Sequence, residues 1–284
     1  MALNGIDVAS YQTGLNPAKV PCDFVIVKAT QGTTYTNPDF TRMASATLAA
    51  GKLLGIYHYA GGNDPIKEAD YFIAHIPGYI GKALLALDWE GMQNPKFGKD
   101  DVRWCKAFCD RVYEKTGIRC FVYTSKSVCR AHNWASVAKD YPLWCAQYAS
   151  NQRTGYQSSP WTDGGGFGAW EKATIFQYSS KGNLPGWNAN LDLDIAYLTK
   201  EEWEAWAKGA APGPVEIKYP EMTDNDLAVE VLFNHHGTEQ KRRDSLGNRY
   251  DAVQAEVEVL VTSVSRTIIA TQQYLKKHGH ANLI

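Results

Sequence analysis

Asp88 and Glu90 have the spacing best suited to chemistry in this sequence, because they directly follow the apolar run 84–87. Residues two apart in a strand share a face and lie roughly 6.6 Å apart, so both acids would point into one site while Trp89 points outward. Two close carboxylates beside apolar walls cannot both ionise at low cost, so one pKa rises and that group can donate a proton near neutral pH.

Three further acids accompany this pair in strand-like runs: Asp7 near the start of the chain, and Asp192 and Asp194 near residue 190. Glycoside hydrolysis requires one acid that protonates the leaving oxygen and a second carboxylate that attacks or stabilises the developing cation. An alternative is that these acids only cap helices or pair with Lys28. The constellation of acids favours a glycosidase.

The elements that would position these acids alternate between strands and helices. Stretches 38–50, 65–75 and 99–116 have helical patterns, and such alternation is typical of parallel strands. Eight strands in about 200 residues predict a closed α/β barrel, whose active site lies at the carboxyl ends of the strands. The last strands have short gaps, so the final quarter is expected to be irregular. The predicted strands are 5–9, 24–29, 54–60, 83–90, 120–125, 143–149, 173–179 and 191–198.

Charge and hydropathy exclude several classes of protein. The chain carries 29 basic and 30 acidic residues, a balance that argues against a nucleic-acid partner. No run approaches the ~18–20 apolar residues that cross a bilayer, so no membrane insertion is expected. The first residues lack a basic and apolar signal, which predicts a protein made in the cytoplasm without a signal peptide.

Six cysteines precede residue 146 without a C-x-x-C pair, which predicts free buried thiols. A metal site formed by Cys105, Cys109, Cys129 and His132 is the alternative, but these residues lack the spacing of zinc ligands. Neither a metal nor an organic cofactor is expected, because carboxylates alone can carry glycoside hydrolysis.

A proline- and glycine-rich break at 209–214 separates the barrel from a helical region. A helix over 250–277 would be about 42 Å long, more than a small module can bury. This length suggests a homo-oligomer through the C-terminal helix; packing on the barrel, or a strand at 261–269, are alternatives. The residues expected at this contact are Val261, Val264, Ile268 and Leu275.

An ordered set of motifs over about residues 3–200 resembles the glycoside hydrolase family 25 muramidases. The motifs are GIDVASYQ at 5–12, KATQG at 28–32, GIYHY at 55–59, LDWEG at 87–91, YTS at 123–125, LWCAQY at 143–148, QYS at 177–179 and LDLD at 191–194. The resemblance implies a flattened, TIM-like (β/α) barrel of eight strands with about five helices. It also implies a lysozyme or endolysin that cleaves the β-1,4 bond between N-acetylmuramic acid and N-acetylglucosamine in bacterial peptidoglycan, with retention.

Carried over by motif, the resemblance implies that Glu90 is the general acid and that Asp7, Asp88 and Asp192 line its pocket. Asp88 either attacks the anomeric carbon or orients the substrate's 2-acetamido group to do so, and we favour the second. One departure is Gln31, where the family usually has glutamate; it argues against catalysis at this position and weakens charge pairing with Lys28. The expected substrate-binding residues, several of which could instead be barrel core, are Tyr57, Tyr59, Tyr123, Trp144, Gln147, Tyr178 and Asp194.

Residues 224–261 resemble the Cpl-7-like cell-wall-binding repeat, best at 250–254 and less well at 233–237. The predicted domains are therefore a catalytic barrel at 1–208, a linker at 209–223 and a small all-α wall-binding module at 224–284. Such an enzyme would act on the cell wall, and a phage-encoded one would leave the host through a holin. The alternatives are a non-catalytic wall-binding barrel and another barrel glycosidase; the D-x-x-D-x-D-x-E signature of family 18 chitinases is absent around Asp88.

Overall fold

A computed structural model describes residues 2–210, 222–232 and 235–277 of the chain. The chain divides into two units, 1–212 and 213–284, and each is described by itself. Most of the predicted linker, 211–221, lies outside the described residues, so the finer domain boundaries at 208 and 224 remain a proposal. Among the described helices, none combines the length and the apolar character that a membrane span requires.

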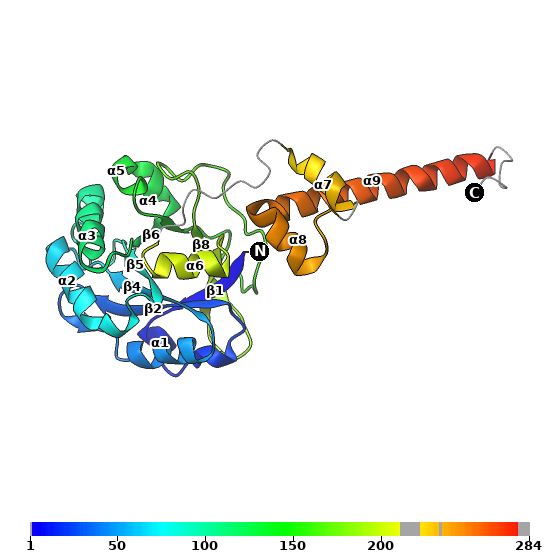
Figure 1. The fold of residues 1–284 in the computed structure, drawn as a ribbon. Helices are drawn as coiled ribbons and strands as arrows, with labels where there is room; N and C mark the ends of the chain where they lie inside the picture. The colour runs from blue at the N-terminus through cyan, green and yellow to red at the C-terminus, as the bar shows by residue number, and fades with distance from the viewer. Residues whose placement is uncertain (1, 211–221, 233–234, 278–284) are drawn as a thin grey trace. The chain divides into compact units, whose positions relative to one another are not determined.

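The first unit is a closed barrel, because β1 pairs with β2 on one side and with β9 on the other. All eight predicted strands are present, and a short extra strand, β3 (Tyr35–Thr36), adds to the edge of β2. The prediction of an eight-stranded α/β barrel is confirmed (Figure 1). The barrel strands are β1 (Leu3–Val8), β2 (Phe24–Gln31), β4 (Leu53–Tyr59), β5 (Ala83–Asp88), β6 (Phe121–Ser125), β7 (Leu143–Ala146), β8 (Ile175–Gly182) and β9 (Leu191–Ala196).

Strand direction changes in the last quarter of the barrel. Apart from the short β3, which is antiparallel to β2, neighbouring strands from β1 through β8 run parallel. Strand β9 is antiparallel to both β8 and β1. Parallel pairing, expected from strand and helix alternation, is therefore wrong for β9. Only residues 183–190 connect β8 to β9, too few for the crossover that a parallel pair needs, so the chain turns back on itself.

Over residues 2–210 the barrel unit has six α-helices, and α1 to α5 lie outside the strands in Figure 1. Helix α2 begins at Pro65, and the preceding Asp64 accepts hydrogen bonds from two backbone amides of the first turn. Trp203 of α6 contacts Phe24 and closes the amino end of the barrel, which leaves the carboxyl ends of the strands open. The helices are α1 (Phe40–Ala49), α2 (Pro65–His75), α3 (Asp101–Thr116), α4 (Lys126–Ala131), α5 (Ala135–Ala138) and α6 (Lys200–Ala207).

The barrel has two apolar cores, one on each face of its strands. The outer core, between strands and helices, contains Trp89, Trp104 and Phe108, whereas the inner core contains Phe24 and Trp144. All six cysteines are free thiols, as predicted. Five of them are buried, and Cys22 is half-buried.

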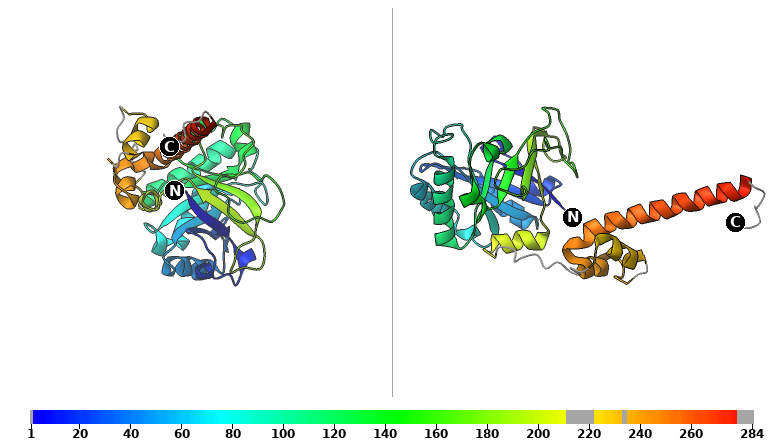
Figure 2. Two further views of the ribbon diagram at one scale, coloured as in Figure 1. Left: turned by 90° about the vertical axis from the view of Figure 1, so that its right-hand side faces the viewer. Right: turned by 90° about the horizontal axis from the view of Figure 1, so that it is seen from above.

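In the described residues of the second unit, 222–232 and 235–277, there are three α-helices, α7 (Asp224–Leu232), α8 (Glu239–Leu246) and α9 (Tyr250–Lys277). Leu227 and Val231 of α7 pack against Val253 and Val257, which lie in the first turns of α9. Helix α9 then continues beyond the two shorter helices of this unit (Figure 2). The alternative of a strand at 261–269 is wrong, because the whole stretch is helical.

Candidate active site

The predicted acid pair lies at the carboxyl end of β5. Asp88 is the last residue of the strand and is buried, and Glu90 follows it half-buried. Trp89 points away from the barrel interior, as expected, and is fully buried in the outer core. Its indole nitrogen donates to the Asp101 carboxylate at 2.8 Å. Its backbone amide donates to the Tyr123 carbonyl, and its carbonyl accepts from Thr124. These bonds fix the backbone on both sides of Trp89 and hence the direction of both carboxylates.

The antiparallel pairing of β9 with β1 brings the other acids to the same interior. Asp7 lies opposite Asp192, and Asp194 lies two residues further along β9. Burial raises the pKa of Asp7 well above its usual value, and the neighbouring carboxyl group of Asp194 raises it further. Asp194 also accepts a hydrogen bond from the Trp144 indole at 2.8 Å and is fully buried. Contact of Asp194 with substrate remains a prediction.

The acids influence one another across the barrel interior. Burial raises the pKa of Asp88, and the nearby carboxylates of Glu90 and Asp7 raise it further, while Lys28 opposes the rise. Burial likewise raises the pKa of Glu90, again against Lys28. Burial raises the pKa of Asp192 to about 8, with additional contributions from Asp7 and Glu90. Burial and mutual repulsion therefore favour the protonated forms of these carboxyl groups, as a general acid requires.

Four predicted substrate-binding aromatics form the inner wall beneath these acids. Tyr57, Tyr59, Tyr123 and Trp144 all belong to the inner core and are less than 10% exposed. Trp144 contacts Tyr123 with ring centroids 4.5 Å apart, and the Tyr59 hydroxyl donates to the Met92 carbonyl. The two interpretations of these residues, core and site wall, therefore coincide; their contact with substrate remains a prediction.

Tyr178 does not face this site. It belongs to the outer core, and its hydroxyl accepts a hydrogen bond from the Gln157 amide at 3.1 Å. The residue beside it, Gln177, faces inward instead and donates to Asp7 at 2.5 Å. Its amide oxygen accepts from Tyr123 and from Tyr148. Gln177 is not among the site residues predicted from the sequence, although neighbours in a strand point to opposite faces, so only one of Gln177 and Tyr178 can face inward.

Gln147 supports a neighbouring loop. Its amide oxygen accepts from the Thr162 hydroxyl at 2.9 Å and from the Asp163 backbone amide at 3.2 Å. The buried Lys126 holds the same loop through Thr162 and Asp163. Gln147 and Lys126 therefore hold the loop in place. Because the amide oxygen of Gln147 is already hydrogen-bonded, its amide nitrogen is the group that we predict to bind substrate.

Replacing Gln177 should impair the reaction more than replacing Tyr178. In Gln177→Met the Asp7 carboxyl loses its donor and two tyrosine hydroxyls lose their acceptor, so we expect kcat to fall roughly 10–100-fold, the range of a mispositioned catalytic group. Tyr178→Phe removes only a hydroxyl on the outer face and should change kcat less than about twofold. Steady-state hydrolysis of cell walls by the two variants tests this order, and equal losses would contradict it.

The barrel should become less stable as the pH rises. A carboxyl whose pKa is higher in the folded protein stabilises it fully below the unfolded value of 3.8, and this contribution is lost as the pH rises through the folded value. Those folded values are about 8 for Asp192 and about 7 for Asp194. The unfolding temperature should therefore be lower at about pH 8 than at about pH 5.

Asp194→Asn provides the control for this pH dependence, because it keeps the shape and removes the titration. Its unfolding temperature should vary less between the two pH values than that of the parent protein. The buried His58, whose pKa is lowered by burial, acts in the opposite direction and is common to both proteins. Parallel curves for the two proteins would show that Asp194 does not titrate in this range.

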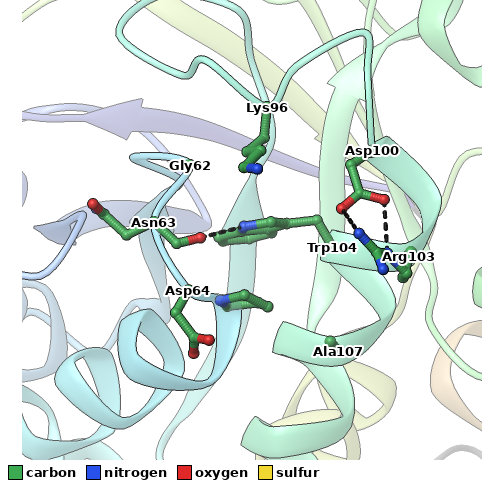
Figure 3. A pocket seen from close by; sticks show the side chains of 9 residues that line it. Gly62, Asn63, Asp64, Lys96, Asp100, Arg103, Trp104 and Ala107 are labelled. Atoms are coloured by element: carbon green, nitrogen blue, oxygen red, sulfur yellow. Dashed lines mark hydrogen bonds and ion pairs between the residues drawn. The ribbon is translucent and has the colours of Figure 1, made fainter.

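A separate cleft of about 580 Å³ opens between the loops that follow β4 and β5 (Figure 3). Its centre is Trp104, whose indole donates to the Asn63 carbonyl at 2.8 Å, and Asp100 pairs with Arg103 on one side. The predicted catalytic carboxylates do not line this cleft. Its other lining residues are Gly62, Asp64, Pro65, Lys96 and Ala107.

A closed α/β barrel with a carboxylate pair at its open end is an arrangement that glycosidases use. Residues 6–187 match the glycosyl hydrolases family 25, and residues 225–261 match the CW_7 repeat. The chain belongs to glycosyl hydrolase family 25 and carries a C-terminal Cpl-7-like cell-wall-binding repeat, as the two resemblances implied.

Named relatives and solved structures agree with this assignment. An N,O-diacetylmuramidase of Chalaropsis sp is 34% identical over 214 residues, covering 70% of this chain and 98% of the relative. Lysozyme M1 of Streptomyces globisporus is 29% identical over 67% of this chain and 66% of the relative. The crystal structure of a bacterial lysozyme from Streptomyces coelicolor superimposes with a TM-score of 0.62 at 25% identity, covering 74% of this chain and 99% of that one.

Proposed function

We propose that this chain is a muramidase that cleaves the β-1,4 bond between N-acetylmuramic acid and N-acetylglucosamine in peptidoglycan, with Glu90 as general acid. The observation that carries the proposal is the half-buried Glu90 beside the buried Asp88, at the open end of a barrel of this family. Burial raises the pKa of Glu90, which favours the protonated form that a general acid needs. The muramidase and lysozyme relatives support the same substrate.

In the proposed reaction, Glu90 protonates the bridging oxygen as the bond to the anomeric carbon breaks. The oxygen of the substrate's own 2-acetamido group attacks that carbon, and Asp88 orients the acetamido group and stabilises the positive charge on it. Water, deprotonated by Glu90, then opens the cyclised sugar from the opposite face to the acetamido oxygen, so the two displacements together retain the anomeric configuration. Asp7 and Asp192 line the same pocket, and the charge of Glu90 raises the pKa of each of them.

The experiment that tests this function is mass spectrometry of purified peptidoglycan after digestion and borohydride reduction. Reduced muramic acid ends are expected. Reduced N-acetylglucosamine ends would instead identify a glucosaminidase. Wall binding without any new reducing end would favour the non-catalytic barrel, and activity on chitin alone would favour a different glycosidase.

We further propose that residues 224–284 hold the enzyme on peptidoglycan and that copies of the chain associate along α9. Val259, Val261 and Val264 are 61%, 48% and 55% exposed, although they follow the turns of α9 that form the core of the module. Val253, Val257, Leu260 and Val264 follow the alternating four- and three-residue spacing by which helices pair. The side chains of Ile268 and Leu275 lie outside the described part of the structure.

Sedimentation of the full chain tests the proposed association. We expect an oligomer that Val264→Glu weakens at least tenfold in dissociation constant, because the charge would enter an apolar contact. Lys139→Glu, on the exposed surface of the barrel unit, should leave the sedimentation unchanged. A parent protein that stays monomeric at high concentration would exclude the association.

A further inference from the structure

Strand β2 contains a β-bulge that places Lys28 and Gln31 on the same face. Lys28 pairs with Tyr57 and Thr30 pairs with the next residue, His58, so Ala29 is the inserted residue. In a regular strand, residues three apart point to opposite faces, and one insertion between them brings both to one face. Lys28 and Gln31 therefore both reach the interior of the barrel.

Asn37 holds this bulge in place. Its side-chain amide donates to the Lys28 carbonyl, and its backbone amide donates to the Ala29 carbonyl, both at 2.8 Å. Asn37 is 2% exposed, so these bonds are protected from water. On the outer face, Thr30 contacts the buried His58 at 2.8 Å. The bulge is thus fixed from both sides.

The side chain of Gln31 joins two parts of the active site. Its amide oxygen accepts a hydrogen bond from the Lys28 ammonium at 2.7 Å, and its amide nitrogen donates to the Gln93 side chain at 2.7 Å. Gln93 lies three residues after Glu90, and its φ of 58° is in the left-handed region. Within residues 2–210, 222–232 and 235–277, no other non-glycine residue has a positive φ. The preceding residue, Met92, is tied to the barrel by the Tyr59 hydroxyl.

The Lys28 ammonium faces the acid pair. It lies 4.4 Å from the ring centroid of Tyr59 on β4 and 5.6 Å from that of Tyr35 on β3. From β5, the charges of Asp88 and Glu90 raise the pKa of Lys28, and its positive charge in turn opposes the rise in both of theirs. Gln31 is neutral, so the charge of Lys28 is held in place without being neutralised.

We propose that Gln31 is a positioning residue for the reaction of Glu90: one end of its amide holds Lys28 toward the Asp88 and Glu90 pair, and the other end holds the loop that carries Gln93. The residue has no direct contact with the reacting atoms. The expected kinetic effects rest on the proposed muramidase function. The hydrogen bonds of Gln31 and the effect of Lys28 on the two carboxyl groups do not depend on that function.

The two hydrogen bonds of Gln31, to Lys28 and to Gln93, form a bridge between β2 and the loop after β5. Three variants distinguish the effects of its two ends. Gln31→Glu would add a negative charge that neutralises the positive charge of Lys28. It should therefore move the alkaline limb of the kcat/KM profile upward by roughly half to one pH unit. Gln31→Met removes both bonds; it should move this limb in the same direction and raise KM several-fold. Gln93→Gly keeps the left-handed backbone and cuts only the loop end, so it should raise KM and leave the limb in place.

The control is Lys139→Gln, which makes the same change in net charge at an exposed position between α5 and β7, and it should leave both kcat/KM and its pH dependence unchanged. A thermal unfolding scan of each variant verifies that it is folded. Superimposable pH profiles and unchanged KM values for both Gln31 variants would overturn the proposal.

Carbon NMR titration of the Asp88 and Glu90 carboxyls in the same proteins needs no substrate. Raised titration midpoints in Gln31→Glu and Gln31→Met support the bridge, and unchanged midpoints in both overturn it, whether or not the parent protein cleaves peptidoglycan. A parent protein that releases no reducing ends while its midpoints respond would contradict the proposed function and leave the bridge supported.

Discussion

Glu90→Gln should reduce muramidase turnover by roughly a thousandfold, the scale on which a positioned general acid contributes. The amide has almost the shape of the carboxyl, but it cannot supply the proton that the leaving oxygen needs. Glu90 lies half-buried after β5, and the hydrogen bond from Trp89 to Asp101 fixes the backbone beside it. The substitution should therefore prevent proton transfer to the leaving oxygen and change little else. Release of reducing ends from purified walls measures the effect.

Wall binding separates loss of catalysis from loss of folding. Glu90→Gln should sediment with purified walls as well as the parent protein, because the C-terminal module is unchanged. Glu201→Gln, an exposed position in the first turn of α6, is the matched control and should keep full activity. Turnover of Glu90→Gln within tenfold of the parent value would remove Glu90 from the role of general acid.

Asp88→Asn should lower kcat roughly 100–1000-fold, as expected for loss of one preorganised charge that stabilises the transition state. Asp88 is 6% exposed at the end of β5, with Glu90, Lys28 and Asp7 around it. If Asp88 orients the acetamido group, a thiazoline analogue of the cyclised sugar should inhibit the parent protein competitively. The same analogue should bind Asp88→Asn much more weakly.

The alternative mechanism, in which Asp88 itself attacks the anomeric carbon, makes a different prediction. If Asp88 is the nucleophile, the parent protein should form a covalent glycosyl ester that mass spectrometry can trap with a fluorinated substrate, and the thiazoline should have little effect. Asp140→Asn, which lies before β7 at the other end of the barrel, serves as the control and should match the parent protein in both assays. A trapped ester on Asp88 would rule out assistance by the acetamido group.

Local patterns in the sequence were sufficient to predict the strands and helices and the pairing of Asp88 with Glu90. The eight apolar runs of strand length and the helical stretches between them predict the barrel, because the period of apolar residues reflects which face of each element is buried. Asp88 and Glu90 share a face by the two-residue period of a strand alone. The helical character of the second unit follows from the spacing of Val253, Val257 and Leu260 in the same way.

Three features of the site depend on pairing between strands that are distant in the sequence. The antiparallel direction of β9 sets Asp192 opposite Asp7, and that direction follows from the short connection and closure of the barrel. The bulge at Ala29 brings Gln31 beside Lys28, and register with β4 reveals it. The inward direction of Gln177, rather than Tyr178, depends on the register of β8 in the closed sheet.

The amino-acid sequence by itself thus determined the kinds of element, their order and the presence of an acidic site, because these depend on side chains close together in the chain. Only the tertiary structure decided which neighbours support each acid. Strand direction, register and single-residue insertions are set by hydrogen bonds between distant segments, and each can reverse the face to which a side chain points.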